Sequence, residues 1–90
     1  MISLDVNQFT SKELVTIRAT VNLLREGGFL GGQASSFRSD GAELISVMPI
    51  NDGPALYVIG KERGQYYMLD RDGRSVAKSS RLEDVLAALP

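Results

Sequence analysis

The stretch GQYYMLDRDGRSVAKSS, residues 64–80, decides the fold class because it has the pattern of a complete β-hairpin. Apolar residues lead into an Asp-Arg-Asp-Gly turn at 70–73, and a second short strand follows. Aspartate at the first turn position and glycine at the fourth suit a type I turn followed by a left-handed residue. Because side chains alternate along a strand, Tyr66 and Tyr67 are predicted to point to opposite faces of the sheet.

Two registers are compatible with this hairpin. In the first, Asp70 opposes Arg74 and Met68 opposes Val76. A tighter two-residue loop would instead place Val76 opposite Leu69.

Turn signals elsewhere in the middle of the chain extend the hairpin into a meander. Asp-Gly or Arg-Gly pairs occur at 40–41, 52–53, 63–64 and 72–73. Their spacing is typical of short antiparallel strands joined by tight turns. Strands are predicted at about 34–38, 43–49, 55–60, 65–70 and 74–78. Residues 2–6 also alternate apolar and polar side chains, which suits a short edge strand or an unpaired lead-in.

Helical patterns stand on both sides of the strands. Thr10 and Glu13 have the spacing of a capping box, which predicts a helix over 11–26. Ser80 and Glu83 repeat that spacing and predict a short helix at the end of the chain. The predicted apolar faces of the two helices consist of Leu14, Ile17, Val21 and Leu24, and of Leu82, Val85, Leu86 and Leu89.

These patterns predict a single α+β domain over residues 1–90, with an N-terminal helix, an antiparallel meander of four to five strands and a short C-terminal helix. Hydrophobic residues at 43% and charged residues at 23% are typical of a globular protein. No apolar run is long enough to span a membrane. The N-terminus also lacks the pattern of a secretory signal, so we expect a cytoplasmic protein.

No catalytic, cofactor-binding or metal site is predicted. The chain contains neither cysteine nor histidine, which excludes thiolate and imidazole ligands and Ser-His-Asp chemistry. The 70–81 segment fails as a calcium loop, because glycine falls at its fourth position and arginine at its twelfth. The glycine-rich segment 27–33 follows a helix, whereas a phosphate loop precedes one. We therefore expect a protein that is not an enzyme.

Apolar side chains on both faces of the predicted strands are the most informative feature for function. Residues 44–48, 56–59 and 66–69 are apolar at nearly every position, although a sheet with one face in water alternates. Either the two helices cover opposite faces, or both cover one face and another molecule covers the other. We favour the second arrangement, which predicts a homodimer or a complex with another protein.

Positive charge is concentrated in the segment 61–81. The chain has a net charge of −1, yet this segment carries an excess of three positive charges. Such an excess attracts an acidic partner or simply keeps a hairpin surface soluble. The candidate interaction surface combines one sheet face with this hairpin and comprises Tyr57, Tyr66, Tyr67, Arg63, Arg71, Arg74 and Lys78.

The sequence thus predicts a small protein-interaction or regulatory module that self-associates through a sheet face. One alternative is a domain that binds a small apolar ligand between the long helix and the sheet, in a pocket lined by Met48, Tyr57 and Met68. A third is weak binding of single-stranded nucleic acid through the basic hairpin, which the negative net charge and the few aromatic residues disfavour.

Overall fold

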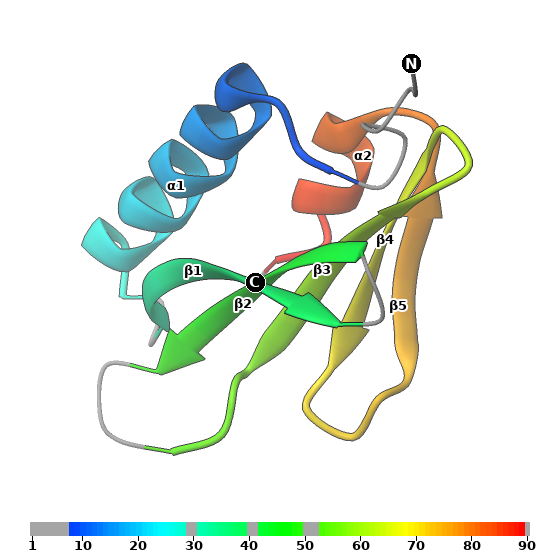
Figure 1. Cartoon of the computed structure of the whole chain (residues 1–90). Coiled ribbons are helices and arrows are strands. Elements are labelled where there is room, and N and C mark those ends of the chain that lie inside the picture. The colour runs from blue at the N-terminus through cyan, green and yellow to red at the C-terminus, as the bar shows by residue number, and fades with distance from the viewer. Residues whose placement is uncertain (1–7, 29–30, 40–41, 50–52, 90) are drawn as a thin grey trace.

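A computed structural model describes residues 8–28, 31–39, 42–49 and 53–89. The described chain has the predicted α+β architecture, a helix followed by a five-stranded antiparallel meander and a second short helix (Figure 1). The elements are α1 (Ser11–Glu26), β1 (Gly31–Ser39), β2 (Ala42–Pro49), β3 (Tyr57–Glu62), β4 (Gln65–Asp70), β5 (Ser75–Ser79) and α2 (Leu82–Leu86). The predicted edge strand at 2–6 lies outside the described residues.

The long helix α1 begins and ends as its sequence predicts. The Thr10 side chain accepts a hydrogen bond from the Glu13 amide at 3.1 Å, and the Glu13 carboxylate accepts one from the Thr10 amide at 2.8 Å. This capping box satisfies two amides that the first turn leaves without helical partners. After the last turn, Gly28 has a φ of 105°, which the absence of a Cβ atom permits.

The predicted cap of α2 is wrong. Arg81, not Ser80, is the N-cap residue, and its side chain makes no capping hydrogen bond. The backbone stays extended through Arg81, directly after β5, so the helix starts one residue later than the capping-box pattern predicted. Ser79 organises this junction instead: its hydroxyl accepts a bond from the Arg81 amide and donates one to Asp84, both at 3.1 Å.

The strands are joined in chain order, so every neighbour in the sheet is also a neighbour in sequence. Between β3 and β4 a two-residue turn places Arg63 and Gly64 at positive φ, 51° and 78°. Positive φ at both central residues is the signature of a type I′ turn, whose twist matches that of the flanking strands. This turn fixes the pairing of Glu62 with Gln65.

The β4–β5 hairpin begins in the first of the two predicted registers. The Asp70 amide donates to the Arg74 carbonyl at 2.9 Å, and the Gly73 amide donates to the Asp70 carbonyl at 3.0 Å. Gly73 has a φ of 82°, as the predicted left-handed position requires.

Further along the hairpin, both predicted partners of Val76 are wrong. Leu69 pairs with Ser75, and Met68 pairs with Ala77. Val76 is the extra residue of a β-bulge, which leaves it out of the ladder and 43% exposed.

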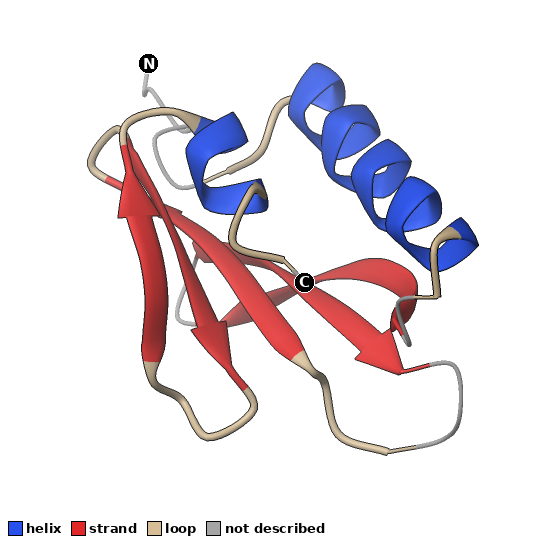
Figure 2. Cartoon of the chain, turned by 180° about the vertical axis from the view of Figure 1, so that it is seen from behind, coloured by secondary structure: helices blue, strands red, loops and turns tan. Residues whose placement is uncertain are grey.

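Both helices lie on the same side of the sheet, which Figures 1 and 2 show from opposite directions. In the described residues α1 packs against β1, and α2 packs against β4 and β5. The buried helix residues and the buried strand residues form one hydrophobic core between the two layers. That core consists of Phe9, Ile17, Val21, Ala34, Ile45, Val47, Ile59, Met68, Leu82, Val85, Leu86 and Leu89.

Candidate interaction face

The side of the sheet that faces away from the helices is the candidate site. Successive side chains of a strand point to opposite faces, so the neighbours of the buried residues Ile45, Ile59 and Met68 point away from the core. The strand register then assigns one residue after another to this side. We call it the outer face, and it comprises Ser35, Phe37, Leu44, Ser46, Met48, Val58, Gly60, Glu62, Gln65, Tyr67, Leu69 and Lys78.

The middle of the outer face is apolar. Leu44 pairs with Gly60, and Val58 pairs with Leu69, so apolar side chains on β2, β3 and β4 are adjacent. Leu44, Val58 and Leu69 are partly exposed, and Phe37 on β1 is 42% exposed. No helix in the described part of the chain covers them. Adjacent apolar side chains that stay partly exposed make this face a candidate interaction site.

The Tyr67 side chain lies across the centre of this face, over its neighbour Gly60. A Cβ atom added to its cross-strand partner Gly60 would overlap the Tyr67 ring, so the ring occupies the space above the glycine. Burial, with a smaller contribution from the negative charge of Glu62, raises the pKa of Tyr67. The residue type at position 60 therefore sets the position of the aromatic ring.

On the helix side of the sheet, three polar side chains form a separate cluster. Glu13 accepts hydrogen bonds from the Tyr66 hydroxyl and from the Lys61 ammonium group, the latter at 3.3 Å. Lys61 also donates to the Gln8 carbonyl at 3.4 Å and lies 5.6 Å from the centre of the Tyr66 ring. These contacts join the N-terminus of α1 to β3 and β4.

The electrostatics of this cluster follow from its hydrogen bonds. Burial raises the pKa of Glu13, but the bonds from Tyr66, from the Thr10 amide and from Lys61 outweigh it and hold that pKa below its usual value. The bond to the Glu13 carboxylate, together with burial, raises the pKa of Tyr66 to about 12. Carboxylate and phenol thus keep their ordinary charges at neutral pH, and the cluster serves as a structural tie.

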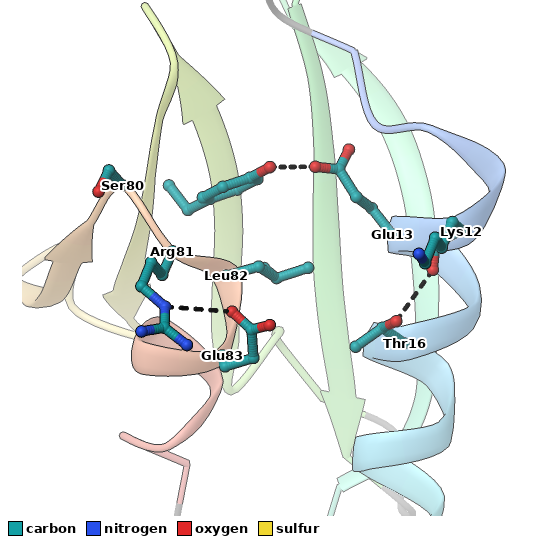
Figure 3. Close-up of a pocket in the computed structure, with 8 residues that line it drawn as sticks. Lys12, Glu13, Thr16, Ser80, Arg81, Leu82 and Glu83 are labelled. Carbon is teal, nitrogen blue, oxygen red and sulfur yellow. Dashed lines mark hydrogen bonds and ion pairs between the residues drawn. The ribbon is translucent and has the colours of Figure 1, made fainter.

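Two of the pockets that the described residues form lie between the helices. The first, of about 290 Å³, is lined by polar residues of α1 and of the segment that begins α2. Figure 3 shows Lys12, Glu13 and Thr16 on one side of it and Arg81 and Glu83 on the other. The second, of about 370 Å³, is more apolar and is lined chiefly by Leu24, Leu86 and Leu89 with two threonines.

The structure separates the three tyrosines of the predicted interaction surface. Tyr57 and Tyr66 are on the helix side and pack against the core, and only Tyr67 is on the outer face. Met48 is on the outer face as well, opposite to Tyr57 and Met68, so these three side chains do not line one pocket.

The basic residues of the predicted surface are also separated. Arg63 is in the β3–β4 turn, whereas Arg71 and Arg74 are in the β4–β5 turn at the other end of β4. Lys78 is on the outer face, paired across the ladder with Tyr67. The seven residues therefore do not form one patch, and Tyr67 and Lys78 are the two that share the outer face.

Several outer-face residues were not predicted from the sequence to belong to the interaction surface. Gly60 lies inside β3, and a glycine inside a strand indicates close approach of another group. Leu44, Val58 and Leu69 belong to the strands that were recognised as apolar on both faces, but the residues of each face could be assigned only once the register was known.

No helix within the described ranges is long and apolar enough to cross a membrane. The same ranges hold no cluster of three or more acidic side chains suited to a metal ion. Comparison of the chain with protein-family models, with curated proteins and with solved structures found no match.

Proposed function

We propose that this chain is a protein-interaction module that self-associates through the outer face. The observation that carries the proposal is the placement of both helices on one side of a sheet whose other side is also apolar. Removal of apolar surface from water is the main driving force of protein association. An outer face covered by a second protein surface would account for the apolar residues that water otherwise contacts.

Light scattering across a concentration series tests this proposal. We expect a mass that rises from one chain toward two as the concentration increases. Leu44→Asp, which puts a charge in the middle of the outer face, should abolish the rise. Leu23→Asp is the matched control, because Leu23 is 68% exposed on α1, away from the outer face.

A milder variant separates loss of association from loss of folding. Val58→Thr keeps a β-branched side chain of nearly the same size and adds one hydroxyl group to the outer face. It should weaken association while the circular dichroism spectrum stays native. A strictly monomeric wild-type chain at high concentration, or equal association by wild type and Leu44→Asp, would overturn the proposal of self-association.

A second candidate function is the binding of a small apolar ligand in the apolar pocket between α1 and α2. Its volume of about 370 Å³ lies at the small end of the range of ligand sites. A short-chain fatty acid should then raise the melting temperature, and Thr20→Trp, which fills the pocket, should remove that effect. Self-association would be unchanged by Thr20→Trp, so the two functions are separable.

A further inference from the structure

Two charges of opposite sign lie on the outer face beside Tyr67. Glu62 ends β3, and Lys78 is on β5; both are exposed, and neither has an ion-pair partner among the described residues. Strands are about 4.8 Å apart and residues on one face of a strand are about 6.8 Å apart, so two strands and one such step separate the Cα atoms of Glu62 and Lys78 by about 12 Å.

Leu44 and Leu69 are separated on the sheet in the same way as Glu62 and Lys78. Leu69 on β4 is two strands away from Leu44 on β2 and one same-face step along, in the same direction as Lys78 from Glu62. On an ideal, untwisted sheet lattice, the separation of Leu44 from Leu69 is parallel and equal to that of Glu62 from Lys78. On the same lattice, one line joins the midpoint of Glu62 and Lys78 to the midpoint of Leu44 and Leu69. This line is perpendicular to both separations, because twice the square of the strand spacing of about 4.8 Å equals the square of the residue step of about 6.8 Å.

A two-fold axis along this line exchanges Glu62 with Lys78 and Leu44 with Leu69, because it passes through both midpoints at right angles to both separations. We propose, building on self-association through the outer face, that two copies pack face to face about an axis in the plane between their sheets. The axis sets Glu62 against Lys78 of the partner subunit, and Leu44 against Leu69 of the partner subunit. Each contact then occurs twice, as a two-fold interface requires.

The same axis brings Tyr67 to the centre of the interface. It passes between Gly60 and Tyr67, so the two Tyr67 rings, each lying over its own glycine, are next to each other. A rigid aromatic residue near the centre of an interface is the usual kind of anchor. The strands of the two copies cross at about 70°, near the orthogonal class of sheet packing.

The available area sets the expected strength. The five strands give a face of roughly 20 by 20 Å, so two copies bury on the order of 1,000 Å² in total. That area is near the lower bound of specific interfaces. We therefore expect a dimer that dissociates on dilution, in which two pairs of charges have a measurable effect on the dissociation constant.

A charge-swap experiment tests the axis. In a homodimer of E62K, lysines face lysines, and in a homodimer of K78E, glutamates face glutamates; each should raise the dissociation constant by at least about tenfold. When the two variants are mixed, the chain with two lysines faces the chain with two glutamates. The mixture should therefore form heterodimers, detected by labelling one variant and measuring its mass distribution or energy transfer.

The controls carry the same charge changes elsewhere. Glu26→Lys and Arg18→Glu reverse exposed charges on α1, and their mixture should show no preference for heterodimers. The double variant E62K/K78E restores opposite charges across the axis and should associate as wild type does. All four positions are exposed, so none of the variants is expected to unfold the chain.

The outcomes separate this inference from the function on which it rests. If Leu44→Asp abolishes association but the E62K and K78E mixture shows no preference for heterodimers, the outer face is the interface and the proposed axis is wrong. If neither set of variants affects association, or the chain stays monomeric, self-association through the outer face is wrong as well.

Discussion

Glu13 has a role in local structure and another in tertiary structure. One of its oxygens accepts hydrogen bonds from the Thr10 amide and from Lys61, and the other accepts from Tyr66. The first of these bonds is local and belongs to the capping box, whereas the other two span about half of the chain. A single carboxylate thus couples the start of α1 to the sheet.

Alkaline titration tests this coupling. The pKa of Tyr66 is raised from 10 to about 12, so the folded state favours the neutral phenol. The resulting stabilisation is fully present below pH 10 and is lost as the pH rises from 10 toward 12. Tyrosinate absorbance should show a step near pH 12 that Tyr66→Phe removes and that Glu13→Gln moves to lower pH. The coupling is absent if Glu13→Gln leaves that step unchanged.

Gly60 gives a second prediction about a single residue. Gly60→Ala places a Cβ atom where the Tyr67 ring lies, so the ring must move away from the sheet at a cost of about 1–3 kcal/mol. The pKa of Tyr67 should fall toward its ordinary value because burial is the main cause of its increase. Urea unfolding and tyrosinate absorbance measure the two effects.

Gly27→Ala is the control, because a Cβ atom there makes only ordinary contact. A second check is the pair Gly60→Ala and Tyr67→Ala. The first substitution should destabilise less when Tyr67 is already alanine, since the overlap is then gone. Equal destabilisation in both backgrounds would show that ring overlap is not the cause.

At the scale of elements, the two capping-box patterns have different outcomes. Thr10 and Glu13 make both bonds of the box, whereas Ser80 makes none because the backbone remains extended through Arg81. The pattern is local, but whether it is used depends on where the preceding element ends. Thr10 lies outside any strand, whereas Ser80 directly follows the end of β5.

Matched alanine substitutions test this difference. Thr10→Ala removes a real cap and should lower the free energy of unfolding by about 1 kcal/mol. Ser80→Ala removes a hydroxyl that caps nothing and should change it by less than about 0.5 kcal/mol. Chemical denaturation of the two variants measures both values. A loss for Ser80→Ala as large as that for Thr10→Ala would mean that Ser80 caps α2 in solution.

For the whole molecule, the important fact is that the two faces of one sheet have different surroundings. Ile59 is fully buried between the sheet and the helices, and the adjacent Val58 is partly exposed on the outer face. The alternation of a strand thus assigns neighbouring apolar residues to two different roles, one in folding and one in the proposed association.

Neighbouring substitutions in β3 separate these roles. Ile59→Ala leaves a cavity in the core and should cost about 2–5 kcal/mol of folding stability. Val58→Ala should cost clearly less when the protein is dilute, yet weaken self-association at high concentration. Thermal unfolding at low concentration and light scattering at high concentration provide the two readouts. Comparable folding losses at the two positions would contradict the division between faces.

The sequence by itself determined the elements and their order. Helix α1, its capping box and its glycine stop were predicted from residues within a few positions of one another, as were the turns at 63–64 and 70–73. Turns this short join neighbouring antiparallel strands, so the turns also predicted that the strands form a meander. These features depend on local backbone preferences and on hydrogen bonds close in sequence, which a single sequence records directly.

Only the tertiary structure decided which residues share a surface. The bulge at Val76, the unused cap at Ser80 and the bond between Glu13 and Tyr66 depend on groups that meet through the sheet and the helix packing. The sequence showed apolar residues on both faces of three strands but left open whether one or both faces lay under a helix. Packing of both helices on one face is a property of the assembled core, and no local pattern encodes it.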